Sequence, residues 1–187
     1  AFLAEVEERM HGILGAITGV GPRSSFPLGF HHTATITDRR LALVGDAAHG
    51  IHPIAGQGLN LGLRDAATLV EVVAHTGAES VVTMGAMAGM APHPRPLGVV
   101  ASSTNPLLAE RLGLDRPSYQ GPTGLIGVLH DALDQAGIPV ISLRVSVPHY
   151  VPDTPNPKAT RSLLRRFEQV TGIVTGYAEL DGPAAEW

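Results

Sequence analysis

Apolar and polar positions alternate along the chain in two ways, one typical of helices and one of short buried strands. Apolar residues recur every three or four positions in five segments: residues 1–14, 59–75, 105–112, 123–136 and 157–172. Continuous apolar runs of strand length occur at residues 41–45, 80–84, 97–102 and 139–147. Strands that alternate with helices predict an α/β fold with a mainly parallel sheet and helices on both of its faces.

Capping residues and glycines mark the ends of several of these elements. Asn105 and Asn156 each precede a proline, which is the arrangement expected at a helix start. Gly77 and Gly137 follow predicted helices and are expected to end them. Residues 24–36 mix aromatic and β-branched side chains before a polar turn at 37–40, which predicts a β-hairpin near the N-terminus.

Composition narrows the classes of function. The 187 residues carry a formal net charge of −4 and no cysteine, which excludes disulfides, cysteine-ligated metal and thiol catalysis. A nucleic-acid binder is not expected, because such proteins carry a basic excess. The longest nearly apolar run, residues 81–91, is too short for a membrane span, and the acidic N-terminal residues do not resemble a signal peptide. We therefore expect a cytoplasmic protein.

The stretch from residue 40 to residue 65, RLALVGDAAHGIHPIAGQGLNLGLRD, has the features of a cofactor cradle. A predicted strand places Asp46 at its carboxyl end, where ligands bind in open α/β sheets. Gly56 and Gly58 have no side chains, so the backbone there is able to approach a ligand closely. The helix that follows presents free N–H groups and a positive dipole end to an electron-rich group.

The run GDAAHGIHPIAGQGLNLGLRD resembles the third FAD motif of aromatic-hydroxylase-class flavoprotein monooxygenases, especially the ubiquinone-biosynthesis hydroxylases. The resemblance covers residues 1–76 and includes the preceding SSFPLGFHHTATITD. It implies that Asp46 binds hydroxyls of the flavin ribityl chain. It also implies that the isoalloxazine ring is approached by Pro53 and by the backbone of Gly56, Gly58, Leu59 and Asn60.

This segment departs from the hydroxylase pattern in one important respect. The strand–GxGxxG–helix that binds the FAD pyrophosphate is missing, as is the motif linked to NAD(P)H. The resemblance therefore implies weak or partial FAD binding, and a chain that is not catalytically competent alone. No catalytic residue is assigned.

A second resemblance begins near Glu79 and is carried by GPTGL at 121–125, VPHY at 147–150 and NPKAT at 156–160. These segments resemble the C-terminal two-thirds of PAC2-family proteins, relatives of proteasome-assembly chaperones with an α/β fold similar to nucleoside phosphorylases. The resemblance implies association with a protein partner or a homo-oligomer through this part. The chain is thus divided into residues 1–77 and 78–187, and a designed or recombined chimera, an unusual fusion and an assembly error all fit this division.

Three functional hypotheses follow. The first is a partial FAD-binding segment fused to a PAC2-like domain; the second is a PAC2-like scaffold without flavin; the third is one component of a two-chain flavin hydroxylase. In structural terms, we expect one continuous sheet in which residues 41–45 run parallel to residues 80–84, with helix 59–75 between them.

Other side chains have simpler interpretations. His31, His32, His49 and His52 are loosely spaced and lack an acidic third ligand, so we predict no metal site. His130 and Asp131 are not preceded by a GxSxG turn and are interpreted as structural. Three methionines are expected to fill gaps in a core or interface, namely Met84, Met87 and Met90.

Overall fold

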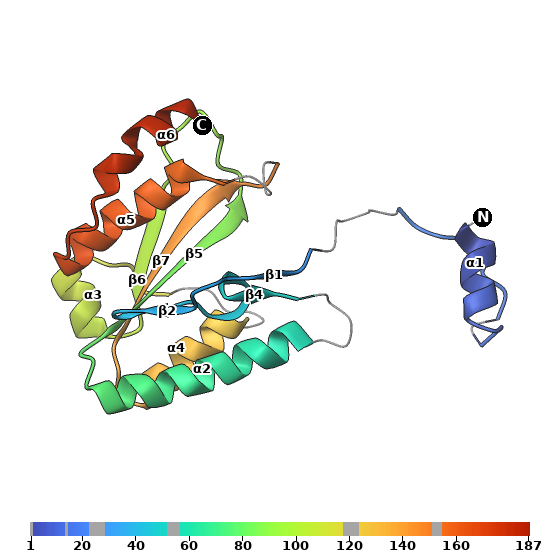
Figure 1. The fold of residues 1–187 in the computed structure, drawn as a ribbon, viewed down its shortest axis with the longest axis horizontal. Helices are drawn as coiled ribbons and strands as arrows, with labels where there is room; N and C mark the ends of the chain where they lie inside the picture. Colours follow the sequence, from blue (N-terminus) through green and yellow to red (C-terminus); the bar gives the residue numbers. More distant parts are fainter. Residues whose placement is uncertain (1, 14, 23–28, 52–56, 118–123, 151–154) are drawn as a thin grey trace.

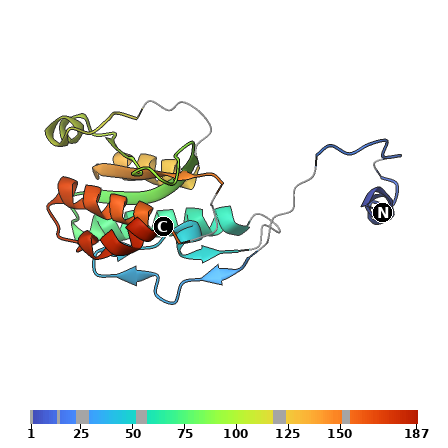
Figure 2. The ribbon, with the colours of Figure 1, turned by 90° about the horizontal axis from the view of Figure 1, so that it is seen from above.

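The computed structural model describes residues 2–13, 15–22, 29–51, 57–117, 124–150 and 155–187. Its elements, in chain order, are α1 (Phe2–Arg9), β1 (His31–His32), β2 (Thr37–Asp38), β3 (Leu41–Ala42), η1 (Gly45–Ala47), β4 (His49–Gly50), α2 (Gln57–Thr76), β5 (Val81–Gly89), β6 (Val99–Ser103), α3 (Pro106–Leu112), α4 (Leu125–Gln135), β7 (Val140–Pro148), α5 (Pro157–Thr171), η3 (Tyr177–Leu180) and α6 (Asp181–Glu186). Helix α1 lies apart from the other elements in both ribbon views (Figures 1 and 2).

A three-stranded sheet with the order β5-β7-β6 is the framework of the fold. Strand β7 pairs in parallel with β5 and antiparallel with β6. The α/β class is confirmed, but the sheet is mixed rather than mainly parallel. The long apolar run of β7 is explained by its central place, because side chains on both of its faces are buried.

Helices α2 and α4 form one layer beside the sheet, and α3 and α5 form another (Figure 1). Alternate residues of β7 face these two layers. Val140 packs in one cluster with α2 and α4, whose buried members include Ala66, Leu129 and Leu133. Ile141 and Leu143 pack in a second cluster with α3 and α5. Helix α2, from the hydroxylase-like segment, therefore shares a core with α4 and β7, which lie in the PAC2-like segment.

The expected strand at residues 41–45 is the main error of the sequence prediction. Only Leu41–Ala42 is a strand, and it pairs antiparallel with β2, so the predicted ladder to residues 80–84 is wrong. Leu41 is 50% exposed, and the next residues form the 3₁₀ turn η1. A short apolar run does not specify its partner, and here the local turn at Arg39–Arg40 closes a two-stranded hairpin instead.

Smaller differences concern element boundaries. The hairpin turn at 37–40 is confirmed, but its strands are β2 and β3 rather than residues 24–36, of which 24–28 lie outside the described residues. Strand β1 pairs with β4. Strand β5 continues to Gly89, beyond the predicted end at residue 84, and α1 ends at Arg9 instead of residue 14.

Helix ends follow the local sequence closely. The Asn105 side chain accepts a hydrogen bond from the Leu108 N–H at 3.0 Å, and the Asn156 side chain accepts one from the Ala159 N–H at 2.9 Å. Gly77 and Gly137 adopt positive φ after α2 and α4. These caps were predicted because they depend on neighbouring residues only.

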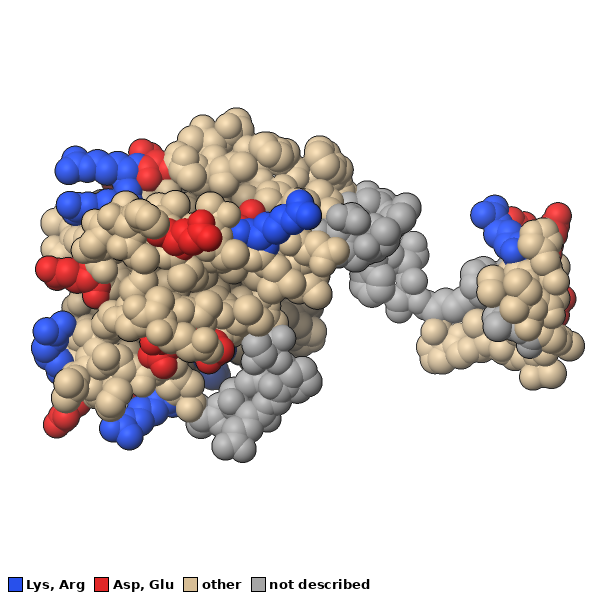
Figure 3. Space-filling view, turned by 90° about the horizontal axis from the view of Figure 1, so that it is seen from below, with Lys and Arg blue, Asp and Glu red and all other residues tan. Residues whose placement is uncertain are grey.

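The surface carries both signs of charge. Acidic and basic side chains are interspersed on the face shown in Figure 3. Among the described helices, none has both the length and the apolar character needed to cross a bilayer.

A matched pair of substitutions on α2 tests its place in the core. Ala66 is 4% exposed and its neighbour Ala67 is exposed. We expect Ala66→Asp to lower the free energy of unfolding by more than about 3 kcal/mol, because it buries an unpaired carboxylate. Ala67→Asp is expected to change it by about 0.5 kcal/mol or less. Urea unfolding followed by circular dichroism measures both, and equal effects would show that α2 is not a core helix.

Candidate functional site

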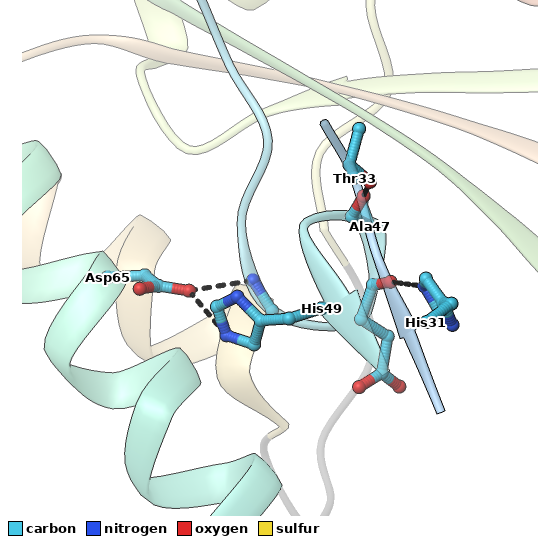
Figure 4. A network of polar contacts seen from close by, with 7 residues as sticks. His31, Thr33, Ala47, His49 and Asp65 are labelled. Carbon is cyan, nitrogen blue, oxygen red and sulfur yellow. Dashed lines mark hydrogen bonds and ion pairs between the residues drawn. The ribbon is translucent and has the colours of Figure 1, made fainter. Parts of the chain in front are cut away.

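The turn that carries Asp46 is held by hydrogen bonds from His31 of β1 and from Thr33, which follows that strand (Figure 4). His31 Nε2 donates to the Asp46 carbonyl oxygen at 2.7 Å, and Thr33 Oγ1 donates to the Ala47 carbonyl oxygen at 3.0 Å. Both hydrogen bonds are accepted by backbone carbonyl oxygens of the turn, not by its side chains. The Asp46 side chain is exposed and accepts no hydrogen bond from the described residues, so its carboxylate is available to a ligand.

A second acidic residue, Asp65 of α2, fixes the turn to the helix. The Gly45 N–H donates to Asp65 Oδ2 at 3.0 Å, and His49 Nε2 lies 3.4 Å from the same oxygen (Figure 4). The His49 and Asp65 side chains are 13% and 27% exposed. Asp65 therefore acts within the fold, as a partner for η1 and β4.

Two glycines of the motif make room for a side chain of the PAC2-like segment. A Cβ built on Gly62 would lie 2.5 Å from Leu125 Cδ2, and a Cβ built on Gly45 would lie 2.9 Å from the same atom. Gly45 also has a φ of +60°, a conformation that favours glycine. Leu125 of α4 thus fits between η1 and α2, and these glycines serve packing inside the protein.

The residues expected to approach a flavin fit that role only in part. Gly58, Leu59 and Asn60 lie in the first turn of α2, and the helix as a whole contacts η1. Pro53 and Gly56 lie outside the described residues. Leu59 is 61% exposed, and a Cβ built on Gly58 would meet Ile51 Cγ1 at an ordinary 3.7 Å. The described residues suit a hydroxyl contact at Asp46, but no close backbone approach at Gly58 is required.

His130 lies in a second polar cluster, on the α4 side of the sheet. Its Nε2 is 2.8 Å from Thr83 Oγ1, in a small cavity also lined by Ser102 and Ser142. Burial lowers the pKa of His130, and the positive charge of Arg144 lowers it further. Asp131 instead accepts a hydrogen bond from the Gln135 side chain on the exposed face of α4. The His130–Asp131 pair therefore does not form a hydrolytic triad with these serines.

No metal-binding cluster is found in the described ranges, where no three His, Asp or Glu side chains gather around one point. His31 and His49 are instead engaged with Asp46 and Asp65, and His52 lies outside these ranges.

Sequence reasoning missed two structural residues: Asp65, which fixes η1 to α2, and Leu125, which packs the PAC2-like segment against η1 and α2. Asp65 closes the hydroxylase-like motif and carries no signal of its own for a contact twenty residues away. Leu125 ends the PAC2-like GPTGL run, and its position against Gly62 depends on how α4 packs on α2. Both contacts are tertiary, and only the folded chain shows them.

Substitution of Asp65 and of Asp46 tests which of the two carboxylates stabilises the fold. Asp65→Ala leaves the Gly45 N–H without its acceptor, so we expect the free energy of unfolding to fall by about 1–3 kcal/mol. Asp46→Ala removes an exposed side chain and is expected to change it by about 0.5 kcal/mol or less. Thermal unfolding of both variants gives the comparison, and a larger loss for Asp46→Ala would contradict the assignment.

The hydroxylase-like segment is similar to part of several curated ubiquinone-pathway enzymes. Seventy residues, 37% of this chain, are 56% identical to ubiquinone hydroxylase UbiL of Rhodospirillum rubrum and cover 16% of that protein. Another 70-residue match is 46% identical to 3-demethoxyubiquinol 3-hydroxylase of Escherichia coli, of which it covers 18%. The chain thus spans less than a fifth of the length of these hydroxylases.

Solved structures resemble a larger part of the chain. A PAC2 family protein from Streptomyces avermitilis is 39% identical with a TM-score of 0.61, over 66% of this chain and 53% of that one. A proteasome-assembly chaperone homologue of Mycobacterium tuberculosis is 38% identical with a TM-score of 0.60, over 68% of this chain and 55% of that one. The model of the PAC2 family matches residues 37–187, and the chain therefore belongs to the PAC2 family.

Proposed function

We propose that this chain is a protein-association domain of the PAC2 type that binds through the open edge of its sheet. The observation that carries the proposal is the exposure of β5, which lies at the end of the order β5-β7-β6. Residues 84–88 of this strand are exposed, including Met84 at 41% and Met87 at 44%. Exposed, uncharged sheet edges are templates for pairing with another chain.

Similarity to the M. tuberculosis proteasome-assembly chaperone homologue supports the same proposal, since an assembly chaperone works by binding proteins. The methionines of β5 were expected to fill a core or an interface. Within the described residues Met84 and Met87 are surface residues, which suits the second of these roles.

In this proposal, the hydroxylase-like segment has a structural role. Helix α2 packs in one cluster with α4 and β7. Asp65 accepts a hydrogen bond from the backbone of η1, and the missing side chain at Gly62 leaves room for Leu125. Residues 1–77 and 78–187 then differ in ancestry, while α2 and α4 form one packed layer. The chain alone is not a hydroxylase, because the motifs for the FAD pyrophosphate and for NAD(P)H are missing from its sequence.

Sedimentation equilibrium tests the proposal. We expect the average mass of the wild-type chain to rise above that of one chain as the protein concentration increases from micromolar to near-millimolar. Met84→Lys adds a charge to the edge strand and is expected to raise the dissociation constant about tenfold or more. Val72→Lys, on an exposed site of α2, is the control and should leave it unchanged. A wild-type chain that stays monomeric at every concentration would overturn the proposal.

Partial flavin binding is a second candidate function, favoured by the exposed carboxylate of Asp46 in η1, a turn that contacts α2. A carboxylate at this place is an acceptor for the ribityl hydroxyls of FAD. The side chains of Leu59 and Asn60, in the first turn of α2, are also exposed, so a ring system has access to that turn. Binding through these contacts alone is weak, and the third hypothesis, a two-chain hydroxylase, would need another chain to supply the pyrophosphate site.

A fluorescence titration with FAD tests this second candidate. We expect Asp46→Ala to weaken FAD binding by about 1–3 kcal/mol, the usual effect of removing one partner of a buried hydrogen bond. Asp38→Ala, another exposed aspartate on the β2–β3 hairpin, is the control and should bind like the wild type. Equal affinity of all three proteins, or no binding by any of them, would rule out a flavin site at Asp46.

A further inference from the structure

The two outer strands of the sheet differ in how their free edges are covered. Beyond β6, Asp115 forms a bridge to Ser102: the Asp115 N–H donates to the Ala101 carbonyl at 2.9 Å, and the Ser103 N–H donates to the Asp115 carbonyl at 3.1 Å. Strand β5 pairs with β7 on one side, and no described residue pairs with its other side. The open edge is therefore that of β5.

Hydrogen bonds at the two ends of β5 show which backbone groups point outward. The Val81 N–H donates to the Pro139 carbonyl at 3.0 Å, and the Gly89 carbonyl accepts from the His149 N–H at 3.3 Å. In a parallel ladder, alternate residues direct both backbone groups to the same neighbour. Odd-numbered residues of β5 therefore face β7, and the outward groups belong to Val82, Met84, Ala86 and Ala88.

The side chains of β5 offer no protection against pairing. Natural edge strands are commonly guarded by lysine, proline or a bulge. Residues 81–90, VVTMGAMAGM, contain no charged residue and no proline, and the nine pairs with β7 run without interruption. Two copies of this strand would meet without charge repulsion.

We propose, building on the association function above, that the partner at this edge is a second copy of the same chain, paired β5 to β5 in antiparallel orientation with Gly85 on the two-fold axis. In this register Met84 lies opposite Ala86 of the second copy, and Val82 lies opposite Ala88. Every outward-pointing residue then takes part in a hydrogen-bonded pair, which shifted registers do not achieve. The same surface serves both copies, as a two-fold dimer requires.

The centre of this arrangement suits a glycine. Gly85 opposite Gly85 is a non-hydrogen-bonded pair, in which the two Cα atoms lie about 4.5 Å apart. A Cβ built on Gly85 meets no other atom within 4 Å, and the φ angle of Gly85 is not positive. A larger residue at position 85 therefore fits within a single chain without strain. Gly85 is thus a place where a reporter side chain is expected to preserve the fold.

Single-cysteine cross-linking tests the register, because the chain has no cysteine of its own. A Cα separation of about 4.5 Å lies within the disulfide range of roughly 4.4–6.8 Å. We expect Gly85→Cys to form a disulfide-linked dimer under mild oxidation. Ala88→Cys is the matched control: it is also exposed on β5, but it faces Val82 of the second copy and should remain largely unlinked.

The outcomes separate this inference from the proposed function. Cross-linking of Gly85→Cys alone supports the two-fold register, and circular dichroism confirms that both variants are folded. Equal cross-linking of both variants, or of neither, overturns the register. If neither variant cross-links while the wild-type chain associates in sedimentation and Met84→Lys weakens that association, the inference fails and association through the β5 edge in another register stands. If the wild-type chain is monomeric, the proposed function fails as well.

Discussion

The fold depends on the packing of helix α2 against α4 and β7. Ala66 and Val73 of α2 lie in one cluster with Leu129, Leu133 and Val140. Apolar burial of this kind is the main favourable contribution to folding. The cluster thus joins helix α2 to α4 and β7, and the PAC2 family model covers all three elements.

This packing changes what the flavin motif does here. Gly62 and Gly45 accommodate Leu125, and Asp65 accepts a hydrogen bond from the backbone of η1. The side chain of Asp46 is left exposed. Glycines and aspartates of the kind that bind a cofactor in the hydroxylases thus pack η1, α2 and α4 together in this chain. Sequence similarity alone does not distinguish cofactor binding from packing.

Local features were predictable from the sequence, and long-range pairing was not. The asparagine caps of α3 and α5 and the apolar run of β7 depend on neighbouring residues, and they were predicted correctly. The partner of residues 41–45 depends on distant residues and was predicted wrongly. The antiparallel direction of β6, which makes the sheet mixed, also depends on distant residues and was not predicted. In the candidate site, Asp46 was identified from its motif, whereas Leu125 and the role of Asp65 required the folded chain.

The central claim is that α2 and β7 belong to one cooperative unit. Native-state hydrogen exchange measures this most directly, because it gives a free energy of opening for each amide. We predict that the amides of Ala66 and Val73 open with the same free energy as those of Ile141 and Leu143, through global unfolding. Fast exchange along α2 while β7 remains protected would contradict a shared core.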